Sequence, residues 1–152
     1  MSYNSCEIEA RSDTVFAVIA DPHTYPAWLV GNAEVREVEP DWPRPGSKFH
    51  HRVGIGPFTL ADSSEVVEIE PGRLLRLHVR ARPFISAMST FRVVGDGVRT
   101  VVSLEEEPVL RLVGAIVRPL MDPLTHVRNH ASLRQLASYI EARDRDGPTS
   151  TS

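Results

Sequence analysis

Residues 118–137, RPLMDPLTHVRNHASLRQLA, decide the fold because they describe a long helix that is apolar along part of one side. At about 100° per residue, one stripe of this helix joins an apolar C-terminal half to a polar N-terminal half. The stripe contains Asp122, His126, Asn129, Leu133, Leu136, Ala137 and Ile140. Asp122-Pro123 is typical of a helix start, so we expect a helix from about 123 to 143, after a short helix or turn near 111–118. Such a helix must bury its stripe against another element.

The chain from residue 33 to residue 108 supplies the strands against which this helix can pack. Turn residues divide it into six segments, at PDWPRPG (40–46), GIGP (54–57), PG (71–72), Pro83 and GDG (95–97). Alternation places one set of side chains on a common, mostly apolar face. This set is Phe49, His51 and Val53; Leu75, Leu77, Val79 and Ala81; Ser89, Phe91 and Val93; and Val102, Leu104 and Glu106. Six strands joined by short turns indicate an antiparallel meander.

The segment 58–70 is the ambiguous part of this meander. Val66-Val67 breaks the alternation, so we expect a β-bulge there. The inward face of the segment stays open, with Asp62 a candidate on the face of Phe58 and Leu60.

Before the meander, the chain forms a strand and two helices. Residues 3–10 alternate as a half-buried strand does, and Ser12 is placed to cap the helix that follows. Asp21-Pro22 starts a second, short helix through about Leu29, which carries Tyr25 and Trp28. The order is therefore β-α-α-β6-α, an α+β fold.

Length and composition indicate one folded domain. The chain has 152 residues, 41% of them hydrophobic and 24% charged, with a net charge of −3. These values are ordinary for a globular domain. We assign residues 1–143 to it and expect the polar tail 144–152 (DRDGPTSTS) to be disordered, because it has nothing to bury.

The same composition excludes several classes of protein. Mild acidity gives no electrostatic case for nucleic-acid binding, and no stretch approaches the roughly 20 apolar residues of a membrane span. The start, MSYNSCEIEARSD, lacks the pattern of a signal peptide, so we expect a cytoplasmic protein. Cys6 is the single cysteine, which excludes an intrachain disulfide.

Metal and cofactor sites are not indicated either. His126 and His130 are four residues apart on the predicted helix, but no glutamate lies between them, and adjacent His50 and His51 face opposite sides of a strand. No nucleophile elbow, dinucleotide fingerprint or phosphate-binding loop is present. We expect no metal and no cofactor.

The element order and several segments together resemble the helix-grip (START/Bet v 1-like) superfamily. The segments are VFAVIADPHTYPAWL (15–29), EVVEIEPGRLLRL (65–77), STFRVV (89–94), EEEPV (105–109) and RPLMDPLTHVRNHASLRQLA (118–137). They are most similar to the bacterial polyketide cyclase/dehydrase and lipid-transport subgroup. The resemblance implies a curved antiparallel sheet wrapped around a long C-terminal helix, with an apolar cavity between them.

Residues on the inward faces are the candidates for lining that cavity. From the sheet we expect Phe49, Leu75, Leu77, Val79, Phe91, Val93, Val102 and Leu104, with Trp28 closing one side and Leu133 contributed by the long helix. Alternation also sends His51 and Glu106 inward, and the helical stripe sends His126 and Asn129 the same way. Unpaired polar groups are costly in a packed core, so we expect these four to orient the polar end of a ligand.

Three functions remain open. The first is binding of a hydrophobic small molecule such as a lipid, an isoprenoid or a polyketide. The second is a polyketide cyclase or dehydratase in which His51, Glu106 or His126 moves protons on an enolisable ligand. The third is an interaction protein that uses the stripe Leu120, Leu124, Val127 and Ala131, either as a dimer contact or only for packing under residues 111–118. We expect a monomer or a homodimer. We favour binding; the sequence identifies neither the ligand nor a reaction.

Overall fold

The computed structural model describes residues 2–55, 57–81, 85–109 and 114–146. Its elements follow the predicted order of one strand, two helices, six strands and a final helix. This confirms the predicted order and the α+β class. They are β1 (Ser2–Ile8), α1 (Ser12–Ile19), the 3-10 turn η1 (Pro22–Thr24), α2 (Tyr25–Trp28), β2 (Asn32–Val38), β3 (Lys48–Ile55), β4 (Phe58–Glu70), β5 (Leu74–Ala81), β6 (Ile85–Gly95), β7 (Thr100–Pro108) and α3 (Gly114–Arg145).

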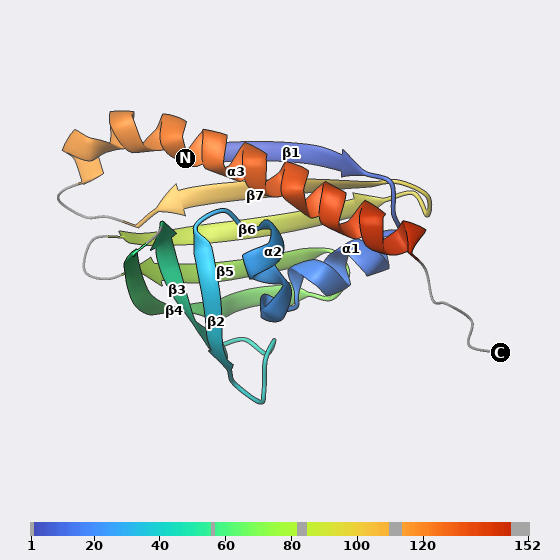
Figure 1. Ribbon diagram of the computed structural model, residues 1–152, viewed down its shortest axis with the longest axis horizontal. Helices are drawn as coiled ribbons and strands as arrows, with labels where there is room; N and C mark the ends of the chain where they lie inside the picture. Colours follow the sequence, from blue (N-terminus) through green and yellow to red (C-terminus); the bar gives the residue numbers. More distant parts are fainter. Residues whose placement is uncertain (1, 56, 82–84, 110–113, 147–152) are drawn as a thin grey trace.

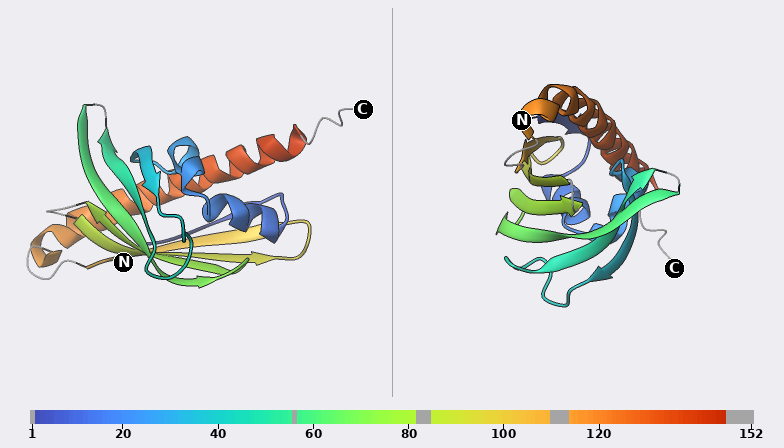
Figure 2. Two further views of the ribbon diagram at one scale, coloured as in Figure 1. Left: turned by 90° about the horizontal axis from the view of Figure 1, so that it is seen from below. Right: turned by 90° about the vertical axis from the view of Figure 1, so that its left-hand side faces the viewer.

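The strands form one antiparallel sheet in the order β1-β7-β6-β5-β4-β3-β2 (Figure 1). The sheet curves, and all the helices lie on its concave side, where α3 runs along the open edge of the arc (Figure 2). α3 packs mainly against β1, β7 and α2. This is the helix-grip arrangement that the sequence resemblance implies.

The core lies between the concave face and the helices. Leu133, Leu136 and Ile140 of α3 are fully buried and belong to the same apolar cluster as the inward side chains of the strands. Trp28 of α2 reaches the sheet through an edge-to-face contact with Phe91, with ring centroids 6.0 Å apart. The C-terminal half of the predicted stripe therefore packs as the periodicity indicates.

α3 differs from the prediction at both ends. It is one continuous helix from Gly114, although Pro119 and Pro123 were expected to break it. The two prolines are four residues apart and so lie on one side of the helix, where each removes a backbone donor without ending the helix. At the other end the helix continues to Arg145, two residues beyond the predicted boundary; residues 110–113 and 147–152 lie outside the described part of the chain.

Of the three predicted helix starts, the one at Asp21 is confirmed, Ser12 does not cap α1, and Asp122-Pro123 lies inside α3. Asp21 Oδ1 accepts a hydrogen bond from the His23 amide at 3.0 Å, as an N-cap does. Ser12 is itself the first residue of α1, and Arg11 occupies the cap position without a side-chain bond. The Thr100 hydroxyl, which donates to the Ala10 carbonyl at 2.7 Å, fixes the chain just before this helix.

The structure also resolves the ambiguity of β4. A shift in register between Val66 and Glu68 confirms the predicted bulge, and Val67 is exposed there. Asp62, Ser64 and Val66 are buried on the concave side. No helix in the described ranges is long and apolar enough to cross a membrane.

Truncating the buried stripe should destabilise the protein. Leu136→Ala removes a side chain that is 0% exposed and should lower the free energy of unfolding by about 2–5 kcal/mol. Leu124→Ala, on the same helix at a position 65% exposed, is the matched control and should change it by less than about 0.5 kcal/mol. Urea denaturation measures both. Equal losses would show that the stripe does not carry the packing of α3.

Candidate ligand-binding cavity

A cavity of about 60 Å³ lies between the concave face, the α2–β2 connection and α3. It follows the cross-strand row Leu77, Ser89 and Glu106 and the neighbouring row of Phe91 and Leu104. Its apolar side chains are Tyr25, Leu29, Val30, Phe49, Val53, Leu77, Val79, Phe91 and Leu104. Its polar side chains are Asn32, His51, Ser64, Ser89, Glu106 and Arg128.

Aromatic rings form a continuous part of the wall. Tyr25 meets Phe49 edge to face with centroids 5.4 Å apart, and Phe49 lies 5.1 Å from the His51 ring. The Tyr25 hydroxyl donates to the Ile19 carbonyl and points away from the cavity into a backbone contact. The ring edges thus give the cavity a rigid apolar side with few free rotations.

Glu106 is held at one end of the cavity by three donors. The Ser89 hydroxyl donates to Oε1 at 2.9 Å, and the Asn129 amide donates to Oε2 at 3.2 Å. The Arg128 guanidinium donates to the same Oε2 and forms an ion pair with the carboxylate. Arg128 also donates to Asn129 Oδ1, so Glu106, Arg128 and Asn129 are each hydrogen-bonded to the other two. The charge of Glu106 is therefore balanced within the protein.

His51 lies on β3, on another part of the wall, and is 1% exposed. Its Nε2 is 2.9 Å from the Ser64 hydroxyl, whereas Nδ1 is buried with no hydrogen-bond partner among the described residues. Burial lowers the pKa of His51 below its ordinary value of 6.5, while the charge of Asp62 and a backbone contact with Ser63, both on the neighbouring strand, act in the opposite direction. The ring is therefore mainly neutral at pH 7, and Nδ1 makes no hydrogen bond of normal geometry to the described residues.

Asn32 stands at the rim, where α2 gives way to β2. Gly31 has φ +91°, a left-handed conformation that favours glycine, and its carbonyl accepts from the Gly54 amide at 2.9 Å. This turn carries Asn32 into the cavity wall. Asn32 Oδ1 is also buried and lacks a hydrogen-bond partner within the part of the chain that the structure describes.

The structure places the predicted cavity residues in four environments, of which His126 alone occupies the last, at the surface. Phe49, His51, Leu77, Val79, Phe91, Leu104 and Glu106 line the cavity. Trp28, Leu75, Val93, Val102 and Leu133 are buried in the core instead. Val93 and Val102 pair in a row nearer to the Gly95 end of β6, and α1 packs against that strand. Asn129 is buried behind Glu106, which it supports without lining the cavity.

His126 is the one predicted polar residue that the structure turns away from the interior. Its side chain is exposed, and its backbone carbonyl accepts from the Asn4 amide of β1 at 3.1 Å. Pro123, Leu124 and Val127 on the neighbouring turns are exposed as well, so this part of α3 is covered less by the rest of the protein than its C-terminal half. The expectation that His126 faces the cavity is therefore wrong.

Sequence reasoning missed several residues of the cavity. Ser64 lies in the β4 segment whose inward face the sequence left open, and Asn32 follows the predicted second helix and was assigned no role. Ser89 was placed on the inward face with Phe91 but was not named as a cavity residue. Arg128 lies beside the stripe, and its long side chain reaches back to Glu106, so helical position alone does not reveal it.

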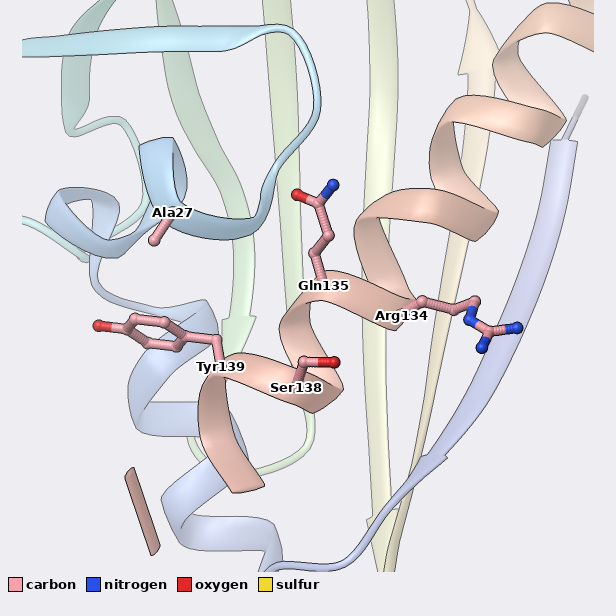
Figure 3. Close-up of a pocket in the computed structure, with 5 residues that line it drawn as sticks. All are labelled: Ala27, Arg134, Gln135, Ser138 and Tyr139. Atoms are coloured by element: carbon pink, nitrogen blue, oxygen red, sulfur yellow. The ribbon is translucent and has the colours of Figure 1, made fainter. Parts of the chain in front are cut away.

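A second hollow is a surface groove between α2 and α3, lined by Ala27, Arg134, Gln135, Ser138 and Tyr139 (Figure 3). The Tyr139 hydroxyl accepts from Arg143 at 2.8 Å, and the guanidinium lies over the ring. The groove is open to solvent and holds no buried polar group. Within the described residues, no group of three or more His, Cys, Asp or Glu side chains could hold a metal ion.

Comparisons with known proteins give a consistent picture of the family. The family profile described as "Polyketide cyclase / dehydrase and lipid transport" matches residues 3–141. No curated protein matches the sequence.

Solved structures show the same fold. The ZhuI aromatase/cyclase from a Streptomyces species aligns over 96% of this chain and 97% of its own, with a TM-score of 0.76 and 18% identity. The di-domain ARO/CYC StfQ from the steffimycin biosynthetic pathway aligns over 94% of this chain and 51% of its own, with a TM-score of 0.74 and 11% identity. A conserved protein from Geobacillus kaustophilus aligns over 92% and 94%, with a TM-score of 0.68 and 17% identity.

The neutral state of His51 makes stability depend on pH. The unfolded ring binds a proton below about pH 6.5, whereas the buried ring resists it, so folding stability falls as the pH drops below that value. In His51→Gln this contribution disappears. We expect the difference in melting temperature, wild type minus variant, to be constant between pH 7 and 8 and to decrease below pH 6.5.

The exposed His126→Gln is the matched control and should follow the wild type at every pH. Parallel wild-type and His51→Gln curves from pH 8 to pH 5 would contradict the buried, neutral state of His51.

Proposed function

The chain belongs to the polyketide cyclase/dehydrase and lipid-transport family, and we propose that it binds a hydrophobic small molecule in the cavity between the sheet and α3. The ligand class is that of lipids, isoprenoids and polyketides. The observation that carries the proposal is a cavity with aromatic and aliphatic walls into which a few fixed polar groups project. Ligand sites commonly combine these two features.

The size of the cavity sets a condition on binding. Sites for drug-sized ligands commonly occupy about 300–1,000 Å³, so a cavity of about 60 Å³ accommodates such a molecule only when its walls separate. The rim of the cavity is the part of the wall that can move, because Val30, Asn32 and Val53 lie outside the buried core cluster. Binding should therefore involve movement of the α2–β2 connection against β3.

Blocking the cavity should prevent loading. Val79 is half-buried in the cavity wall, and Val79→Trp would fill the remaining space. Val94→Trp on β6, at a position 71% exposed, adds the same side chain outside the cavity. Native mass spectrometry of gently purified protein, followed by extraction of the bound molecule, should show a ligand on the wild type and on Val94→Trp. It should show at least about tenfold less on Val79→Trp, the effect of a loss of roughly 1.4 kcal/mol in binding.

Two results would contradict the proposal. One is a wild type that carries no copurifying molecule and binds no hydrophobic compound added to it. The other is equal loading of both tryptophan variants, which would place the ligand elsewhere.

A second candidate function is a polyketide cyclase or dehydratase, favoured by the state of His51. Of the three candidate acid–base residues, His126 is exposed and Glu106 is held by three donors. His51 alone combines a position in the wall with a neutral ring and an unsatisfied Nδ1. In the tautomer whose Nε2 donates to the Ser64 hydroxyl, that nitrogen could accept a proton from the carbon beside a ligand carbonyl, leaving an enolate on the ligand, and the charge of Asp62 would stabilise the imidazolium that forms.

The pH profile of turnover tests this second function. Because burial lowers the pKa of His51 below its ordinary value, the basic form predominates at pH 7 and above. With the copurifying molecule as substrate, kcat should be nearly constant from pH 7.5 to pH 8 and should fall as the pH drops through the lowered pKa. His51→Gln should abolish turnover while the ligand still loads. Unchanged turnover in His51→Gln would eliminate His51 as the base, whereas no turnover by the wild type would leave binding as the function.

A further inference from the structure

Two of the three buried side-chain atoms that lack a hydrogen-bond partner in the described part of the chain line the same cavity. They are His51 Nδ1 and Asn32 Oδ1. The third, Arg76 Nε, belongs to a residue that alternates with the inward-facing Leu75 and Leu77 of β5. Buried polar atoms are usually satisfied, and an unsatisfied one is costly. Their coincidence in one cavity points to a partner that comes from outside the chain.

The register of the sheet places the two residues near each other. Asn32 is paired with Val53, and His51 lies two residues before Val53 on the same face of β3. The two residues are therefore diagonal neighbours, beside a shift in register between Asn32 and Glu34. Both residues line the same cavity.

The donors and acceptors of this pair define the group that fits. Asn32 Oδ1 accepts a hydrogen bond. When the Ser64 hydroxyl donates to His51 Nε2, the neutral ring carries its proton on Nδ1 and donates from it. A hydroxyl can donate to the first and accept from the second at once, whereas a carbonyl satisfies only His51 and a hydrocarbon satisfies neither.

We propose that Asn32 and His51 form a hydroxyl-recognition subsite, so that the preferred ligand is a hydroxylated aromatic compound, a phenol or an enol. This inference rests on the proposed binding function and deepens it. The aromatic edges of Tyr25 and Phe49 beside His51 provide the wall for the ring. The opposite polar group, Glu106, is already satisfied by Ser89, Arg128 and Asn129, so selection by hydrogen bonding falls on the Asn32–His51 end.

The test compares p-cresol with p-xylene by calorimetric titration. The two compounds have nearly the same shape and differ by a hydroxyl in place of a methyl group. A purely apolar cavity prefers p-xylene, the more hydrophobic of the two. The subsite predicts the reverse, with p-cresol bound at least about tenfold more tightly, because p-xylene leaves both polar atoms unpaired.

Substitutions of Asn32 and His51 test whether these two residues cause the preference for p-cresol over p-xylene. Asn32→Leu and His51→Phe should each weaken p-cresol by about tenfold and leave p-xylene unchanged or improved. Asn4→Leu is the matched control: Asn4 is also buried, but it lies on β1 and donates to the His126 carbonyl, away from the cavity. It should lower the melting temperature and keep the preference for p-cresol.

Failure of the subsite and failure of the binding function give different results. Tighter or equal binding of p-xylene by the wild type, or no binding of p-cresol, overturns the subsite. So does a preference that survives in both cavity variants. The wild-type comparison decides the matter even if a variant fails to fold. Ligand loading in native mass spectrometry decides separately whether the binding function stands.

Discussion

The burial of one helical stripe against a concave sheet is the constraint on which the rest of the structure depends. Leu133, Leu136 and Ile140 fix the C-terminal half of α3 over β1 and β7. The N-terminal half must then continue along the same edge, where its residues become polar. Arg128 and Asn129 arrive opposite Glu106 for this reason, and the cavity lies where close packing of apolar side chains ends. The cavity therefore lies where the residues of this stripe of α3 change from apolar to polar.

The polar groups around the cavity differ in whether the protein itself supplies their hydrogen-bond partners. Glu106 shows how the protein buries a charge at low cost, with a guanidinium, an amide and a hydroxyl all directed at one carboxylate. His51 and Asn32 are treated differently, since each keeps a buried atom without a partner among the described residues. If all of these groups were only structural, we would expect all of them to be satisfied. The contrast between the two ends separates a stabilising network from a recognition surface.

The sequence predicted well which side chains of each strand face inward. It predicted poorly which of these inward side chains line the cavity and which only pack in the core. Period-two alternation gives the side of the sheet on which Phe49, Phe91 or Val93 lies, but it does not show where along a strand a helix covers the sheet. Both Phe91 and Val93 belong to the core cluster, but only Phe91 also lines the cavity, although Val93 follows two residues later on the same face. Asn32 and Arg128 could not be predicted for other reasons. Asn32 follows a left-handed turn at Gly31, and Arg128 acts through the length of its side chain.

Binding and proton transfer make nearly the same demands on this cavity, and the difference lies in the atom that meets His51. The His51 ring is neutral, its Nε2 is hydrogen-bonded to Ser64, and the Asp62 carboxylate lies on the adjacent strand. Such a ring can form a hydrogen bond with an O–H group of a ligand without reacting with it. The same ring becomes a base when an acidic C–H group replaces the hydroxyl and the ligand is held long enough. An enol contains both kinds of atom within one small fragment. The placement of that fragment relative to Asn32 would then determine whether the protein carries its ligand or transforms it.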